Sequence, residues 1–258
     1  MVRLCFYVNG DIMSNVSTYE LEFKIECANE SDDTAAAIIV AAGSSSRMGI
    51  PKQFIDLMGI PVLARTLKKF EYSSSISKIV LVVREDDVLR VQNLVKDYMI
   101  GKVTDIVVGG NSRAQSVKNG LSVLDSNDKY VLIHDGARPL VTEKIIKDVV
   151  LAVKKHTVAA CAVKVKDTIK ICDENGFAIN TPKRDTLYAV QTPQGVVTSE
   201  YIKALNSFEN IDTFTDDLSV MEAAGFKPYL TEGDYKNIKI TTPDDVVTAI
   251  GFLSGGEE

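Results

Sequence analysis

The segment from Ala41 to Gln53 combines a turn of small residues with two cations, which is what a bound phosphate requires. It reads A-A-G-S-S-S-R-M-G-I-P-K-Q and directly follows an apolar run. Small residues let backbone N–H groups approach phosphate oxygens, and Arg47 and Lys52 supply positive charge. The spacing matches neither G-x-x-x-x-G-K-[ST] nor G-x-G-x-x-G. The segment predicts a phosphate-binding loop; the alternative is an ordinary turn followed by two surface cations.

A second candidate, G-G-N-S-R-A-Q-S-V, runs from Gly109 to Val117. Paired glycines permit close backbone approach, and we expect Ser116 to open a helix with its hydroxyl near the turn. A structural turn and a contact with a nucleotide base explain this pattern equally well.

A third candidate, H-D-G-A-R-P, runs from His134 to Pro139. Asp135 is a candidate ligand for Mg²⁺ or substrate hydroxyls, and Arg138 for a phosphate. The alternative is a β-turn with a local ion pair. We expect His134 to be structural, because the metal and catalytic roles need partners that it lacks.

These candidates lie where predicted strands end. From Ala35 the chain alternates short β-branched runs with longer amphipathic stretches, which predicts an α/β fold with a Rossmann-like, mostly parallel sheet and helices on both faces. Ligands of such sheets bind at the carboxyl ends of the strands. The predicted strands are Ala36–Val40, Lys78–Val83, Asp105–Val108 and Tyr130–His134, and the predicted helices are Pro61–Phe70, Asp86–Tyr98 and Ala114–Leu124.

Residues 1–34 differ from the rest of the chain. Apolar and polar residues alternate from Thr18 to Cys27, the period of a half-buried strand. Because the recognisable fold begins only near Ala35, we expect an N-terminal extension that is dispensable for chemistry, with a functional arm as the alternative.

The composition excludes several classes of protein. With 258 residues, 45% of them hydrophobic and 25% charged, the chain should fold by itself. A net charge of −6 argues against nucleic acid as a partner. Only two histidines and no C-x-x-C argue against zinc, and no apolar run is long enough for a membrane span, so we expect a cytoplasmic protein. Reduced thiols are expected at Cys5, Cys27, Cys161 and Cys172.

Taken in order, seven motifs resemble the 2-C-methyl-D-erythritol 4-phosphate cytidylyltransferase family. The resemblance runs from about Ala35 to Leu253 and implies a nucleotidyltransferase domain over residues 35–258, expected to be a stand-alone transferase. Ser45 departs from the pattern, since relatives commonly carry a second glycine there. The motifs are A-A-G-S-S-S-R-M with P-K-Q, G-G-N-S-R-A-Q-S-V, H-D-G-A-R-P, V-K-D-T-I-K, Q-T-P-Q, T-D-D and N-I-K-I-T-T-P-D-D.

The resemblance implies a nucleotide site. The phosphates of CTP would be wrapped by the first loop, the cytosine base held by the second, and the ribose and metal would lie near the third. The implied nucleotide-binding residues are Ala42, Gly43, Arg47, Lys52, Gly110, Asn111, Ser116 and Asp135, with Asp135 also as the metal ligand.

The resemblance also implies a homodimer. A projecting β-arm at about residues 163–186 would carry Thr168 and Arg184 into the site of the neighbouring subunit. The implied acceptor-binding residues are Asp135, Arg138, Thr168, Arg184, Thr192, Thr215 and Lys239.

The implied reaction is transfer of CMP from CTP to 2-C-methyl-D-erythritol 4-phosphate, with Mg²⁺, or alternatively Mn²⁺, as the cofactor. No general base is needed, because a phosphate monoester is already largely ionised at neutral pH. The implied catalytic cations are Arg47, Lys52, Arg184 and Lys239. The rivals are a ribitol 5-phosphate cytidylyltransferase and a non-catalytic nucleotide-binding module.

Overall fold

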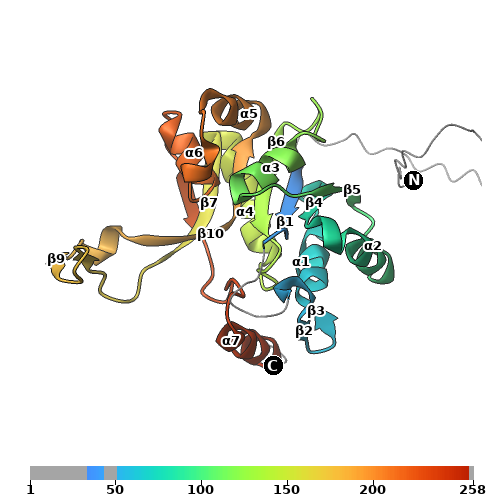
Figure 1. Ribbon diagram of the computed structural model, residues 1–258, viewed down its shortest axis with the longest axis horizontal. Coiled ribbons are helices and arrows are strands. Elements are labelled where there is room, and N and C mark those ends of the chain that lie inside the picture. The colour runs from blue at the N-terminus through green and yellow to red at the C-terminus, as the bar shows by residue number, and fades with distance from the viewer. Residues whose placement is uncertain (1–33, 44–50, 256–258) are drawn as a thin grey trace, which may run out of the picture.

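A computed structural model describes residues 34–43 and 51–255 of the chain. A seven-stranded sheet forms its centre, in the order β11-β7-β10-β6-β1-β4-β5 (Figure 1). Only β10 runs antiparallel to its neighbours among these strands. The strands are β1 (Ala35–Val40), β4 (Ile76–Val83), β5 (Val103–Val108), β6 (Tyr130–Asp135), β7 (Val158–Lys164), β10 (Tyr188–Val197) and β11 (Tyr229–Glu232).

Helices cover both faces of this sheet, as the sequence predicted. The helices are α1 (Val62–Glu71), α2 (Val88–Asp97), α3 (Arg113–Leu121), α4 (Glu143–His156), α5 (Thr198–Ser207), α6 (Asp217–Ala223) and α7 (Pro243–Ser254). The side chains of α1, α2 and α4 share one apolar cluster with the sheet, and those of α3, α5 and α6 share the other.

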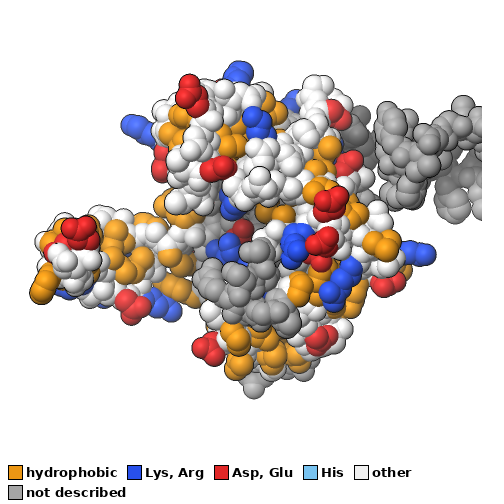
Figure 2. All heavy atoms as spheres, in the orientation of Figure 1, with side chains coloured by type: hydrophobic (Ala, Val, Ile, Leu, Met, Phe, Trp, Pro, Cys, Tyr) orange, Lys and Arg blue, Asp and Glu red, His pale blue; other side chains and the backbone are white. Residues whose placement is uncertain are grey.

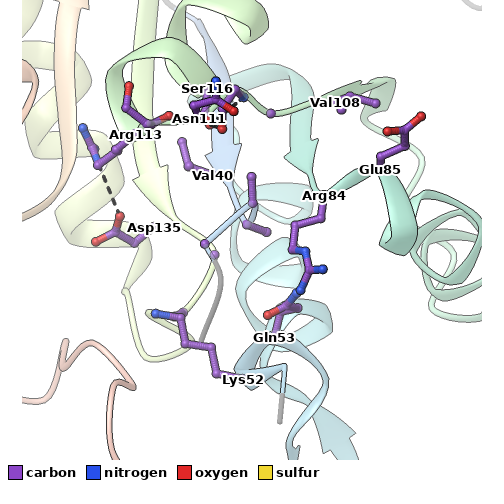
Figure 3. A pocket seen from close by; sticks show the side chains of 18 of the residues that line it. Val40, Lys52, Gln53, Arg84, Glu85, Val108, Asn111, Arg113, Ser116 and Asp135 are labelled. Atoms are coloured by element: carbon purple, nitrogen blue, oxygen red, sulfur yellow. Dashed lines mark hydrogen bonds and ion pairs between the residues drawn. The ribbon is translucent and has the colours of Figure 1, made fainter. Parts of the chain in front are cut away.

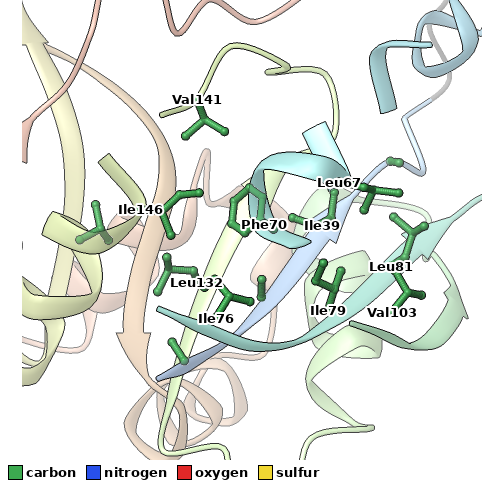
Figure 4. Packing of buried hydrophobic residues seen from close by; sticks show 14 of the residues in the cluster. Ile39, Leu67, Phe70, Ile76, Ile79, Leu81, Val103, Leu132, Val141 and Ile146 are labelled. Atoms are coloured by element: carbon green, nitrogen blue, oxygen red, sulfur yellow. The ribbon is translucent and has the colours of Figure 1, made fainter. Parts of the chain in front are cut away.

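Strand β1 shows how local alternation produces the two layers. Ala37 and Ile39 belong to the first cluster, where Phe70 and Leu132 also lie (Figure 4), whereas Ile38 belongs to the second. Successive side chains of a strand point to opposite faces, so an uninterrupted apolar run fills both cores. This is why β1 reads as continuously apolar.

The predicted elements are confirmed, with shifts at their ends. The stretch predicted as one helix over Asp86–Tyr98 is divided into the short 3-10 helix η2 (Glu85–Asp87) and α2. The prediction that Ser116 opens a helix is wrong: α3 begins at Arg113, because the Ser112 side chain accepts a hydrogen bond from the N–H of Gln115 and caps it.

A hairpin projects from the body of the molecule between β7 and β10 (Figure 1). Its strands, β8 (Ile171–Cys172) and β9 (Ala178–Asn180), form a sheet of their own, and the 3-10 helix η3 (Arg184–Thr186) follows them. The hairpin lies where the sequence predicted an arm; its use in dimerisation stays a prediction.

Helix α7 shares a small third apolar cluster with the short strand β2 (Asp56–Leu57), which pairs with β3 (Ile60–Pro61). Two further 3-10 helices are η1 (Lys52–Phe54) and η4 (Ile211–Thr213). Within the part of the chain that the structure describes, no helix is both long and apolar enough to span a membrane. The extension predicted for residues 1–34 falls almost entirely outside the described residues.

Candidate active site

A cavity of about 670 Å³ opens at the carboxyl ends of β1, β4, β5 and β6 (Figure 3). Segments far apart in the chain form its wall: residues 40–43, 52–53, 84–86, 108–113 and 135–137, with Ser116 and Lys239. The sequence placed its candidate loops at this edge, and the fold brings all of them to one cavity. Lys and Arg side chains also gather near the middle of the face that Figure 2 shows.

The first loop contributes Ala42, Gly43 and Lys52 to the cavity wall. Lys52 begins η1, and its side chain extends along the cavity in Figure 3. Arg47 and Ser45 lie outside the described residues, so the roles predicted for them stay predictions.

The second loop packs tightly against the first. A Cβ atom at Gly109 would come within 2.4 Å of the Ala42 Cβ, and one at Gly110 within 2.1 Å of the Gln115 Cγ. Side chains larger than hydrogen therefore do not fit at either glycine without a shift of the neighbouring atoms. The paired glycines are required by this close approach.

Ser116 holds the backbone of the second loop. Its Oγ accepts a hydrogen bond of 3.1 Å from the N–H of Gly110 and donates one of 2.8 Å to the carbonyl of Ser112. The side chain is buried, at the edge of the cavity wall. This geometry accounts for Ser116 as a structural residue of the turn; contact with a base by Gly110, Asn111 and Ser116 stays a prediction.

Asp135, from the third loop, is surrounded by cations. Its carboxylate lies 2.9 Å from Lys239 Nζ, 3.5 Å from Arg138 Nε and 3.7 Å from Arg113 Nε. Burial by itself raises the pKa of this carboxyl, but the three positive charges together outweigh it and hold the pKa well below its usual range. Asp135 is therefore a permanent anion at the cavity.

His134 is structural, as expected. Its Nε2 lies 3.3 Å from the carbonyl of Arg138 and its Nδ1 3.1 Å from the Thr192 hydroxyl, which also accepts the N–H of Asp135. A carbonyl only accepts, so Nε2 carries the proton and Nδ1 accepts from Thr192. Burial lowers the pKa of His134 to about 3.

The predicted acceptor residues Thr192 and Arg138 lie beneath the cavity rather than in its wall. Arg138 Nη1 donates a 2.7 Å hydrogen bond to the carbonyl of Asn237, and Asn237 Nδ2 donates one of 3.0 Å to the carbonyl of Thr192. These contacts hold the segment that leads to Lys239. The geometry favours a supporting role for both residues, and direct contact with an acceptor stays a prediction.

Three other predicted acceptor residues do not line the cavity within this chain. Thr168 and Arg184 lie on the projecting hairpin segment, and Thr215 lies on an exposed stretch before α6. Arg184 Nη1 donates to the carbonyl of Lys166, 3.2 Å away. Within one subunit, these three side chains are therefore not part of the cavity wall.

Sequence reasoning missed Arg84, Glu85 and Asp86, which line the cavity from the loop after β4. The signal was available: a strand was predicted to end at Val83, and its carboxyl end falls at the same edge as the others. Sequence reasoning also assigned no role to Gln53, although this residue belongs to the P-K-Q motif.

Arg113 was missed because its partners are distant in the chain. Its Nη2 lies 2.7 Å from Asp217 Oδ2, and the buried Asp217 also accepts a 2.6 Å hydrogen bond from Tyr201. Gln194 Oε1 accepts the N–H of Asp217 at 2.9 Å. The Q-T-P-Q and T-D-D motifs thus meet the second loop behind the cavity wall.

The described residues contain no cluster of three or more His, Cys, Asp or Glu side chains suited to a metal ion. Asp135 offers one carboxylate, and its oxygens already face three cations. A mostly parallel sheet with such a cation-bearing cavity at its carboxyl edge is typical of the nucleotide-binding class of α/β proteins.

Comparison with known proteins assigns the chain to one family. The model of the 2-C-methyl-D-erythritol 4-phosphate cytidylyltransferase family matches residues 35–254. A relative of that name from Clostridium novyi is 48% identical over 217 residues, covering 81% of this chain and 92% of its own length. The chain belongs to this family and is a cytidylyltransferase, and the resemblance carried by the motifs is confirmed.

Solved structures agree with this assignment. The 4-diphosphocytidyl-2C-methyl-D-erythritol synthase of Anaerococcus prevotii superposes with a TM-score of 0.77 at 32% identity, covering 86% of this chain and 96% of its own. The 2-C-methyl-D-erythritol 4-phosphate cytidylyltransferase of Francisella tularensis superposes with a TM-score of 0.70 at 33% identity, covering 84% and 98%.

Proposed function

We propose that this chain transfers CMP from CTP to 2-C-methyl-D-erythritol 4-phosphate, giving 4-diphosphocytidyl-2-C-methyl-D-erythritol and pyrophosphate for isoprenoid precursor synthesis. The family match over residues 35–254 carries the proposal. The cavity at the carboxyl edge of the sheet supports it, since its wall presents Lys52 and Arg84 as cations for a triphosphate and Lys239 as a cation for the acceptor phosphate.

In the proposed reaction a phosphate oxygen of the acceptor attacks the α-phosphorus of CTP. The bond between that phosphorus and the bridging oxygen breaks, and pyrophosphate leaves with the electron pair. No proton has to be removed, because the second pKa of a phosphate monoester is about 6. The work of the protein is to position two anions and to neutralise their charge.

Lys52 and, by family resemblance, Arg47 neutralise the nucleotide. Asp135 orients Lys239 through their 2.9 Å ion pair, so that the ammonium group stays at the cavity wall for the acceptor phosphate. Arg138 and Thr192 hold the segment beneath it. The base rests on the glycine turn around Gly110.

Mg²⁺ is the proposed cofactor, with Mn²⁺ as an alternative. It is commonly held by one or two carboxylates together with substrate phosphates, and Asp135 supplies such a carboxylate in the cavity wall. An ion held there would supply positive charge to phosphate oxygens.

The projecting hairpin supports a homodimer with composite sites. Its apolar side chains Ile169, Ile171, Phe177 and Ile179 are exposed, with Phe177 71% accessible. A two-stranded hairpin is marginally stable alone, and a second subunit would bury these side chains. The same contact would carry Thr168 and Arg184 into the site of the partner.

The cytoplasmic location expected from the sequence stays a prediction.

Pyrophosphate release from CTP and Mg²⁺ tests the function, with 2-C-methyl-D-erythritol 4-phosphate and ribitol 5-phosphate offered in parallel. We expect turnover with the methylerythritol compound and a loss of about 10²–10³ in rate for Lys52→Ala. Preference for ribitol phosphate would reassign the acceptor. CTP binding without release of pyrophosphate in the presence of either acceptor would leave only a nucleotide-binding module.

A further inference from the structure

Gln53 is buried although it follows Lys52 at the cavity wall. Only 3% of its surface is accessible, and its Nε2 donates a 3.0 Å hydrogen bond to Asp87 Oδ2. Asp87, at the end of η2, is 8% exposed. The two residues stand 34 positions apart, so this bond joins η1 to the loop that follows β4.

A second contact joins the same two segments. The guanidinium carbon of Arg90, in α2, lies 3.7 Å from the centre of the Phe54 ring. A cation at this distance over an aromatic face is attracted to it. The residues on the carboxyl side of Lys52 are therefore tied twice to η2 and α2.

Both segments line the cavity. Lys52 extends along it from η1, and Arg84 and Glu85 line it from the β4–α2 loop (Figure 3). The link consequently sets where Lys52 stands relative to the opposite wall. Burying a carboxylate and an amide is favourable only when they pair, which gives this arrangement a strong preference for one geometry.

We propose that the Gln53–Asp87 hydrogen bond is a positioning device that holds Lys52 in register with the nucleotide phosphates. The inference rests on the proposed function, because it assigns Lys52 to the triphosphate. A displacement of about 1 Å at such a group costs as much as 10²-fold in rate. Gln53 acts through Lys52, because its amide nitrogen is engaged by Asp87.

Three variants test the bond itself at pH 8. Gln53→Glu replaces the donor with a carboxylate facing Asp87, and like charges this close repel. We expect kcat/KM for CTP to fall by about 10- to 100-fold. Asp87→Asn is the matched control, because its Oδ1 still accepts from Gln53, and it should keep near-normal activity.

The double variant Gln53→Glu/Asp87→Asn restores a donor opposite an acceptor with the polarity reversed. We expect it to recover most of the activity that Gln53→Glu loses. Damage by Asp87→Asn equal to that of Gln53→Glu, or no recovery in the double variant, would overturn the proposal. Thermal unfolding of each variant shows whether the folded state persists.

A double-mutant cycle with Lys52→Ala separates positioning from general destabilisation. If Gln53 acts through Lys52, Gln53→Glu should cost little more once Lys52 is alanine, because coupled residues are not additive. Equal losses in both backgrounds would overturn the proposal.

CTP affinity, measured by calorimetry on the same four proteins, gives a readout that needs no turnover. Suppose that the wild-type protein binds CTP but releases no pyrophosphate, and that the losses of CTP affinity in the two single variants are not additive. This result would support the action of Gln53 through Lys52 and would reject the transferase function. If the wild-type protein binds no CTP, both the positioning role of Gln53 and the transferase function are rejected.

Discussion

Lys239 Nζ lies 2.9 Å from Asp135 Oδ2, and this ion pair fastens the segment before α7 to the carboxyl end of β6. Two further cations, Arg113 and Arg138, lie within 3.7 Å of the same carboxylate. A single anion therefore organises three positive groups from three different parts of the chain. Its removal would leave their charges less balanced, although Arg113 would keep its ion pair with Asp217 and Arg138 its hydrogen bond to the carbonyl of Asn237.

Asp135→Asn should lower the turnover with the methylerythritol acceptor by about 10²-fold, because Lys239 loses the charge that orients it. The KM for CTP should change less, since Lys52 remains in the cavity wall to neutralise the nucleotide. Steady-state pyrophosphate release separates the two effects. The matched control is Asp148→Asn, which removes an exposed ion pair with Lys144 on α4. Equal activity of the Asp135 variant and the wild type would contradict the orienting role.

His134 should make stability depend on pH. Burial lowers its folded pKa to about 3, below an unfolded value of about 6.5. The unfolded chain therefore binds more protons in this window, and stability is present above about pH 6.5 and lost as the pH falls toward 3. Between pH 7.5 and pH 5 this single group should cost about 2 kcal/mol of unfolding free energy.

Urea unfolding at several pH values measures this loss. His134→Gln removes the titrating ring but keeps a side-chain amide donor near the carbonyl of Arg138. The slope between pH 6.5 and 5 should therefore flatten, and the loss of the buried ring should lower stability at neutral pH. A slope unchanged in the variant would assign the pH dependence to other groups.

Arg84→Ala should raise the KM for CTP by about 3- to 10-fold with a small change in kcat. Arg113 and Lys239 are paired with buried carboxylates, whereas the partner of Arg84, Asp86, is 83% exposed at its side chain and 3.1 Å away. An exposed pair is weak, so Arg84 can turn to a polyphosphate. Lys96→Ala, an exposed cation of α2 outside the cavity wall, is the control. An unaltered KM in Arg84→Ala would show that this loop does not bind the phosphates.

Mixing two inactive variants should restore activity if Arg184 works in the site of the partner. A dimer of one Lys52→Ala subunit and one Arg184→Ala subunit contains one site with both mutations and one with neither. Random exchange would then return about a quarter of the wild-type sites. No recovery after refolding the two together would place Arg184 outside the composite site, and each variant refolded alone is the control.

The sequence alone was sufficient for the class of fold, the family and most cavity-lining loops. Those inferences depend on local information: alternation in runs such as Ala36–Val40, and short motifs at the ends of strands. The rule that parallel strands end at one edge then predicted that Lys52, Gly110 and Asp135 meet. The same reasoning applied to the strand ending at Val83 would have found Arg84.

Only the tertiary structure decided what the side chains contact. Ser116 faces its own turn, Thr192 faces His134, and Arg113 pairs with Asp217, 104 residues further along the chain. Such pairings depend on which elements pack together and on burial, which makes an unpaired charge costly. Periodicity and motif spacing carry no such information, so the ion cluster around Asp135 and the Gln53–Asp87 bond could be read only from the folded chain.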